Sequence, residues 1–214
     1  GGKWSFDELN RKKLPKNIDI PKIPKLKKNE FVIQAEKIIS KLNFDYIGNS
    51  DDFLYPTDFE EAEKWLSEFF ENRFFLFGDY EDAICKEQSF LWHGLLSPLL
   101  NVGLLTPKEV IKKALIFGKE NNVPLNSLEG FVRQIIGWRE FINLVYEKYG
   151  VEMRTTNFWN FENKAMPECF YKATTGIEPV DIVLRSILKF GYCHHIERLM
   201  IIGNFMLLCR IHPD

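Results

Sequence analysis

Two adjacent histidines and an arginine stand close together near the end of the chain, in the otherwise apolar run 191–206. His194 and His195 precede Arg198 by four and three residues, so a helix would bring the three side chains onto about one turn of its surface. Imidazole and guanidinium groups are costly to bury without partners. The trio therefore indicates either a ligand or partner site or a set of hydrogen-bonded core groups, and these residues alone leave both interpretations open.

A second candidate is the pair Trp138 and Arg139, within the run 131–141. Arg139 follows Ile135 by four residues, so on a helix it shares an apolar face and needs an acidic or phosphate partner if it is buried. The indole of Trp138 offers a flat surface for stacking. Ordinary core packing is the simpler interpretation of a single tryptophan, so its role depends on a larger pattern.

The elements that must position these residues have helical patterns, which begin at about residue 30. Thr57 with Glu60, and Thr106 with Glu109, have the spacing of capping boxes, in which each side chain bonds an otherwise unpaired backbone N–H group at a helix start. We therefore predict helices that begin at both threonines.

The second half of the chain carries three more helical patterns. Apolar residues recur every three or four positions from Ser127 to Tyr149, which predicts a long helix closed by Gly150. The runs 180–190 and 192–209 keep the same period, and Gly191 is the predicted joint between them. These helices would carry both candidate groups of residues.

The sequence has no strand alternation and no hairpin signal, and the segment 151–178 has the scattered aromatic residues of an ordered long loop. The predicted fold class is therefore mainly α. Residues 1–28 differ, because their basic side chains are interrupted by prolines, which disfavour helices and central strands. We interpret 1–28 as an extended linker, either solvated or in contact with phosphate, and 29–214 as a helical domain.

Composition restricts the class of protein. The chain has 214 residues, of which 45% are hydrophobic and 14% aromatic, enough for a packed core. A formal net charge of -2 excludes a uniformly basic nucleic-acid binder but allows a local basic face.

No apolar stretch approaches the roughly 18 residues of a membrane span, and the first residues do not resemble a signal peptide, so we expect a cytoplasmic protein with no membrane partner. The cysteines lack paired metal-site spacing and are expected to be reduced thiols: Cys85, Cys169, Cys193 and Cys209.

The Trp-Arg-Glu-Phe run at 138–141 resembles the signature of the photolyase and cryptochrome family, and 129–141 is most similar to its bacterial photolyase-related branch. Three further parts of the chain carry the same resemblance, in the same order along the sequence. They are the opening 1–12, the pair of segments 77–83 and 90–98, and the run 192–204. Together these matches span nearly the whole chain.

The resemblance implies that the chain is most of a helical FAD-binding domain, without the α/β antenna domain that precedes it in the family and without the final helices. The family reaction is transfer of an electron from light-excited reduced flavin to a (6-4) or other pyrimidine photoproduct that is flipped out of DNA. We therefore expect FAD as cofactor, damaged DNA as the partner of the parent protein, and a monomer. The parent would be a carbon–carbon lyase, and the isolated chain would be inactive.

The resemblance also implies roles for individual residues. His195 matches the proton donor to the lesion, with His194 as its neighbour, and imidazole suits this task because its ordinary pKa of about 6.5 lies near working pH. Trp138 matches a tryptophan that packs against the lesion. The residues implied to contact FAD are Tyr80, His93, Leu96, Ser97, Arg139, Arg198 and Asn204. A helix that starts near His93 to Ser97 would offer N–H groups to the FAD diphosphate, although Ser97 also suits a plain helix start and Asn204 a hydrogen bond within its own helix.

Three positions depart from the family pattern. Leu199 stands where eukaryotic (6-4) enzymes have a second histidine, and Tyr171 where a relay tryptophan is expected. Pro179 replaces a cysteine that binds an iron–sulfur cluster in some bacterial members, so we expect no cluster in this chain. These departures leave two alternatives open, a cryptochrome-like light sensor without repair activity and a helical scaffold that has lost flavin.

Overall fold

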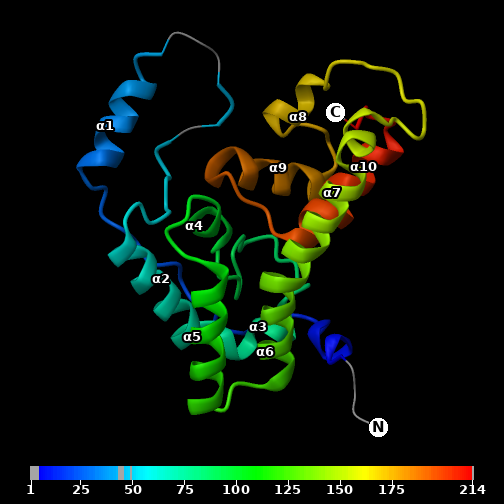
Figure 1. The fold of residues 1–214 in the computed structure, drawn as a ribbon. Coiled ribbons are helices and arrows are strands. Elements are labelled where there is room, and N and C mark those ends of the chain that lie inside the picture. The colour runs from blue at the N-terminus through cyan, green and yellow to red at the C-terminus, as the bar shows by residue number, and fades with distance from the viewer. Residues whose placement is uncertain (1–4, 43–45, 49, 214) are drawn as a thin grey trace.

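The structure is a computed structural model that describes residues 5–42, 46–48 and 50–213. The described residues form helices joined by loops, with no strand among them (Figure 1). The α-helices are α1 (Glu30–Ile39), α2 (Phe59–Asn72), α3 (Phe74–Tyr80), α4 (Ser97–Asn101), α5 (Pro107–Glu120), α6 (Leu125–Val132), α7 (Trp138–Thr155), α8 (Glu168–Lys172), α9 (Glu178–Phe190) and α10 (Asn204–Leu208). A 3-10 helix, η1 (Asp7–Asn10), and two π-helical segments, η2 (Arg133–Gly137) and η3 (Glu197–Gly203), complete the list. The predicted mainly α fold is confirmed.

The main hydrophobic core lies between α2, α3, α5 and α6 (Figure 1). Helix α2 is amphipathic because its apolar residues recur at helical spacing, and its buried face comprises Ala62, Trp65, Leu66, Phe69 and Phe70. Phe69 is at the centre of the core, 0% exposed, and its ring contacts those of Phe70, Phe74, Phe77 and Phe131. A second, smaller cluster joins α8 and α9 to η3 and α10.

One of the two predicted capping boxes is confirmed. The Thr106 hydroxyl accepts the Glu109 N–H, and the Glu109 carboxylate accepts the Thr106 N–H. The prediction for Thr57 and Glu60 is wrong by one residue, since Asp58 caps α2 by accepting the N–H of Glu61 at 2.8 Å. The Thr57 hydroxyl is bonded elsewhere, because it accepts from the side-chain amide of Asn29 at 2.6 Å.

The long helix is longer than predicted and contains a π-helical turn. It runs without a break through α6, η2 and α7, from Leu125 to Thr155, so Gly150 does not end it. Gly191 does end α9, with φ 62° in the left-handed region where glycine is favoured. The predicted long loop 151–178 is correspondingly shorter, since it begins after Thr155 and includes α8. No helix in the described part of the chain has the length and apolar content needed to cross a membrane.

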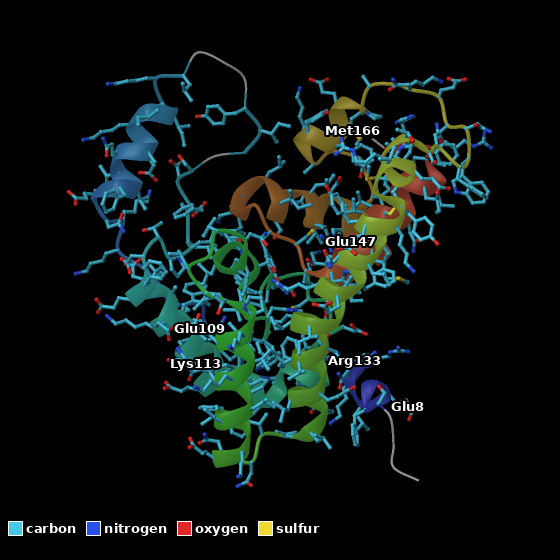
Figure 2. The ribbon with its side chains drawn as sticks, viewed as in Figure 1. Glu8, Glu109, Lys113, Arg133, Glu147 and Met166 are labelled. Carbon is cyan, nitrogen blue, oxygen red and sulfur yellow. The ribbon has the colours of Figure 1, made fainter. Side chains whose placement is uncertain are left out.

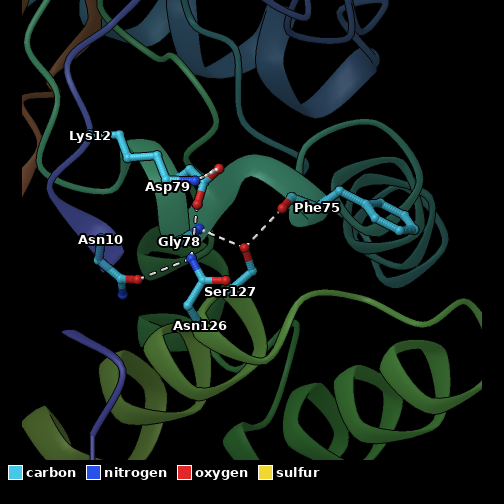
Figure 3. A network of polar contacts seen from close by, with 7 residues as sticks. All are labelled: Asn10, Lys12, Phe75, Gly78, Asp79, Asn126 and Ser127. Atoms are coloured by element: carbon cyan, nitrogen blue, oxygen red, sulfur yellow. Dashed lines mark hydrogen bonds and ion pairs between the residues drawn. The ribbon is translucent and has the colours of Figure 1, made fainter. Parts of the chain in front are cut away.

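A polar network ties η1 to α3 and α6 (Figure 3). The side-chain amide of Asn126 donates to Asn10 Oδ1 at 3.3 Å and to Asp79 Oδ1 at 3.0 Å. Lys12 pairs with the same Asp79 carboxylate at 2.8 Å. Asn10 is 2% exposed, so η1 is packed on the helices, and the proposed division of the chain at residue 28 stays a prediction.

Helices α3 and α6 cross closely at Gly78 and Ser127. The Ser127 hydroxyl accepts the Gly78 N–H at 2.9 Å and donates to the Phe75 carbonyl oxygen at 2.9 Å (Figure 3). A Cβ atom on Gly78 would lie 2.6 Å from the Ser127 Cα atom, which is backbone and cannot rotate away. Only glycine therefore allows this crossing.

Gly78→Ala is expected to lower the free energy of unfolding by about 1–3 kcal/mol, because the helices must move apart to admit the methyl group. Urea unfolding followed by circular dichroism measures this change. Gly150→Ala is the matched control, since its Cβ would meet the Tyr146 ring at an ordinary 3.4 Å and alanine favours a helix. Equal stability of Gly78→Ala and the wild type would contradict the proposed close crossing.

Candidate functional site

The candidate site is a central cavity of about 1060 Å³, to which segments far apart in the sequence contribute. Its walls come from α4 and the loop before it, from η2 and the first turns of α7, and from residues 191–198. Most of the predicted site residues line it, namely His93, Leu96, Ser97, Trp138, Arg139, His194, His195 and Arg198. The volume is that of a typical ligand or cofactor pocket.

His195 and Trp138 face each other in this cavity. Their ring centroids are 5.0 Å apart, at an interplanar angle of 60°. Trp138 is 41% exposed, so it is a wall of the cavity and not a core residue. His195 Nδ1 lies 3.4 Å from Arg198 Nη2. The pKa of His195 is lowered, mainly by burial and to a smaller extent by the charge of Arg198. The carboxylate of Asp82, which also lines the cavity, raises this pKa.

His194 points elsewhere, which corrects the expectation that the three polar residues share one turn. The helix begins at His195, and His194 lies in the non-helical segment before it. Its ring stacks on that of His93, with centroids 4.8 Å apart and an interplanar angle of 16°, and the residue is 4% exposed. His195 and Arg198 do meet as predicted, whereas His194 belongs to a buried pair of histidines at the cavity wall.

This buried pair has hydrogen-bonding atoms without partners in the described structure. They are His93 Nε2 and both ring nitrogens of His194. The pKa of His93 is lowered to about 3, mainly by burial and to a smaller extent by the nearby His194 and Arg73. The pKa of His194 is lowered to about 4, mainly by burial and to a smaller extent by His195. Both rings are therefore neutral near pH 7. Buried polar atoms normally have partners, so these nitrogens are exceptions within the described structure.

The two buried imidazoles predict that acid destabilises the fold. In the unfolded chain a histidine takes up a proton at its ordinary pKa of about 6.5, whereas the folded pKa values are about 3 for His93 and about 4 for His194. The unfolded state therefore binds more protons between these limits. Stability is fully present above about pH 6.5 and falls as pH decreases towards the folded pKa values, by up to about 1.4 kcal/mol per pH unit for each histidine.

This pH dependence is measured by urea unfolding between pH 7 and pH 4. The doubly substituted chain His93→Phe with His194→Phe is expected to have a smaller slope of stability against pH over this range, because the depressed imidazoles are gone. His212→Phe, outside the cavity lining, is the matched control. An identical slope in wild type and double variant would show that the two rings are not responsible.

Sequence reasoning missed Arg73, which supports the His93 side of the cavity. The side chain is 0% exposed, its Nη1 donates to the His93 carbonyl oxygen at 3.1 Å, and its Nη2 pairs with Glu68. Burial lowers its pKa to about 10. The signal in the sequence was a single arginine followed directly by Phe74 and Phe75, in a segment rich in phenylalanine.

Glu197 was also missed, and it supports His194. The side chain is 4% exposed, accepts the backbone N–H of His194 at 3.1 Å, and places Oε1 3.7 Å from His194 Nε2. Burial raises the pKa of this carboxyl group. The arrangement is half of a capping box, so the signal was an acid three residues after the residue that begins the turn. Glu197 thereby helps to fix the start of the helix that presents His195.

Two predicted cofactor residues do not line the cavity. Tyr80 packs on Trp92, with ring centroids 4.7 Å apart, in a separate small cluster. Asn204 donates to the Met200 carbonyl oxygen at 3.2 Å, the intrahelical bond that was the alternative interpretation. The direct contacts to a bound cofactor that were expected of these two residues therefore have no support in the geometry.

Ser97 and Arg139 line the cavity in less specialised ways. Ser97 is the first residue of α4, which has only 5 residues, and the N-cap position is Leu96, so no side chain caps this helix. The Arg139 guanidinium donates to the Ile135 carbonyl oxygen at 3.0 Å, within its own helix. Burial lowers the pKa of Arg139. A cation at this place remains directed to the cavity, where an acidic ligand group would meet it.

The residues relevant to a metal cluster are dispersed. No group of three or more His, Cys, Asp or Glu side chains in the described ranges could hold a metal ion. Pro179 lies in the first turn of α9, where proline is well tolerated. Tyr171 is 47% exposed while its neighbour Phe170 is buried. That this chain holds no iron–sulfur cluster stays a prediction.

Comparison with known proteins finds similar sequences. A family model described as deoxyribodipyrimidine photo-lyase-related protein matches residues 1–55. The chain is 35% identical over 214 residues, all of its length, to a (6-4) photolyase of Agrobacterium fabrum, and covers 42% of that protein. It is 37% identical over 113 residues to an uncharacterized protein of Acanthamoeba polyphaga mimivirus, covering 85% of that protein and 52% of this chain.

The chain thus spans less than half the length of the (6-4) photolyase it matches. The match nevertheless extends over all 214 residues of this chain. The chain belongs to the deoxyribodipyrimidine photolyase-related family.

Proposed function

We propose that the central cavity is the FAD site of a light-driven DNA photolyase, which in its full-length form repairs (6-4) or other pyrimidine photoproducts. The observation that carries this proposal is the meeting of His195, Trp138 and Arg198 in one cavity with the buried His93–His194 pair. The chemistry that bound reduced flavin supplies is light-driven electron transfer to the lesion.

The residues of the cavity fit such a cofactor. FAD carries an anionic diphosphate, and Arg139 and Arg198 line the cavity as cations. The stacked rings of His93 and His194 line the same cavity and add an aromatic surface to it. Leu96, which is 5% exposed, adds an apolar wall. These groups would bind and orient the cofactor and exclude water from part of its surface.

His195 is the proposed proton donor to the lesion. A guanidinium group can only donate hydrogen bonds, so the contact at 3.4 Å makes His195 Nδ1 the acceptor from Arg198. Nε2 then carries a proton in the neutral ring and also in the imidazolium, so it is the atom that would donate to a substrate. Trp138, at 5.0 Å from this ring, would stack on the base that is flipped out of the duplex.

The test uses the full-length protein loaded with FAD and a duplex that contains one (6-4) photoproduct. Blue light is expected to restore the original pyrimidines, measured by chromatography of the digested DNA, whereas a dark sample stays unrepaired. Absence of repair by the flavin-loaded protein contradicts the proposal. Photoreduction of the flavin with no preference for damaged DNA would instead support a cryptochrome-like light sensor.

A further inference from the structure

A second, smaller cavity adjoins the central one, and no role has been assigned to it. It has a volume of about 390 Å³ and lies along η2, between η1 and the start of α7. We call it the annex and define it by the residues Asn10, Glu81, Arg133, Gln134, Trp138 and Phe141, with two glycines. Glu81, Gln134 and Trp138 line both cavities, so the annex and the central cavity share a wall.

One wall of the annex is aromatic and its floor is open. Trp138 and Phe141 lie edge to face, with centroids 6.1 Å apart, and are 41% and 57% exposed. The glycines of the annex leave room for a flat group, because a Cβ on Gly137 would meet nothing within 4 Å. At Gly130 a Cβ would lie 2.7 Å from Asn10 Nδ2, so a larger residue there would displace this side chain. The space suits a planar ring that stacks on aromatic side chains.

The opposite wall carries an oriented carboxylate. Glu81 accepts hydrogen bonds from Asn10 Nδ2 at 3.1 Å and from Gln134 Nε2. Asn10 is itself held by Asn126 at 3.3 Å, so the carboxylate is fixed by the network that anchors η1. A carboxylate offers about four acceptor positions and therefore suits a ligand with N–H groups.

A cation stands at the rim of the annex. Arg133 is half exposed, its Nη1 donates to Ser5 Oγ at 2.9 Å, and it pairs with Glu129 at 3.3 Å. Figure 2 shows Arg133 beside η1, on which Glu8 is labelled. A guanidinium at this place can contact a phosphate group next to a ring bound in the annex. The annex therefore has an aromatic wall for a base, an acceptor for its N–H groups and a cation for its phosphate. Together these groups match one nucleotide of a single strand.

We propose that the annex binds an unpaired nucleobase of the DNA, next to the lesion that enters the central cavity. This inference rests on the proposed function, because removal of a lesion from the duplex leaves the bases opposite it without their pairing partners. The base stacks on Phe141 with its edge towards Trp138, donates an N–H to Glu81, and places its phosphate at Arg133. The shared wall places this site beside the point at which the lesion enters the central cavity, where the unpaired bases of the opposite strand would lie.

The experiment measures DNA affinity of the full-length, flavin-loaded protein by fluorescence anisotropy. Two labelled duplexes are compared, one with a bubble of unpaired thymines and one with abasic nucleotides in the same bubble, neither carrying a photoproduct. The wild type is expected to bind the thymine bubble about tenfold more tightly, the effect of one stacked base. Phe141→Ala is expected to lose this preference. Leu144→Ala, also exposed on α7 but outside both cavities, is the matched control and keeps it.

Equal affinity of the wild type for the two bubbles, or no binding of either, overturns the inference. An unchanged preference in Phe141→Ala, with its fold verified by circular dichroism, overturns it as well. Because no photoproduct is present, the result is separable from the repair assay. If the protein fails to repair the photoproduct but still prefers the thymine bubble, the inference about the annex stands and the proposed function is contradicted.

Discussion

His195→Ala in the full-length protein is expected to lower the rate of (6-4) photoproduct repair by about 10²–10⁴-fold while FAD stays bound, the usual contribution of a positioned acid. The reason is the place of the imidazole, at 5.0 Å from the Trp138 ring and with Nδ1 facing Arg198. Single-turnover repair after a saturating light flash measures this rate, and flavin absorbance checks occupancy. His212→Ala is the matched control, because His212 does not line the central cavity.

The same experiment, repeated over a range of pH, predicts the direction in which the repair rate changes. The imidazolium is the stronger acid, so the repair rate should fall as pH rises through the pKa of His195, which lies below its ordinary value. Asp82 acts to raise this pKa, so Asp82→Asn should move the fall in rate to lower pH. A rate that is insensitive to His195→Ala, or a pH profile unmoved by Asp82→Asn, would remove His195 from the role of donor.

Phe69→Ala is expected to lower the free energy of unfolding by about 3–5 kcal/mol, since it removes a fully buried ring and leaves a cavity. Phe69 is 0% exposed and touches four other rings, so its neighbours have little room to collapse into the space. Phe59→Ala on the same helix is the control, because Phe59 is 68% exposed and surface changes stay within about 0.5 kcal/mol.

Urea unfolding at pH 7 measures both variants, and Phe69→Leu should lie between Phe69→Ala and the wild type. A loss of less than about 1 kcal/mol for Phe69→Ala would mean that the aromatic cluster is loosely packed, since tightly packed rings cost more to remove. The result also concerns the cavity. Trp65, on the same helix, donates its indole N–H to the Gly94 carbonyl oxygen at 2.9 Å, and Arg73 holds that of His93. The core therefore fixes the loop that forms one cavity wall.

Local structure was largely predictable from the sequence. The capping box at Thr106 and Glu109 and the left-handed joint at Gly191 depend on residues within one turn of each other, and both are confirmed. Pairing of His195 with Arg198 likewise requires only helical spacing. Such features depend on neighbouring residues alone, so the mainly α class follows from the sequence.

Tertiary structure decided what periodicity does not encode. The π-helical turn η2 interrupts the regular α-helix just before Trp138, and the apolar pattern of the sequence did not predict it. His194 stacks on His93, and Arg73 bonds the His93 carbonyl oxygen, although these residues are far apart in sequence. Such contacts form only when the aromatic core brings separate helices together. The sequence by itself determined the helices and the residues able to do chemistry, whereas long-range packing decided which of them share a cavity and which are buried behind its wall.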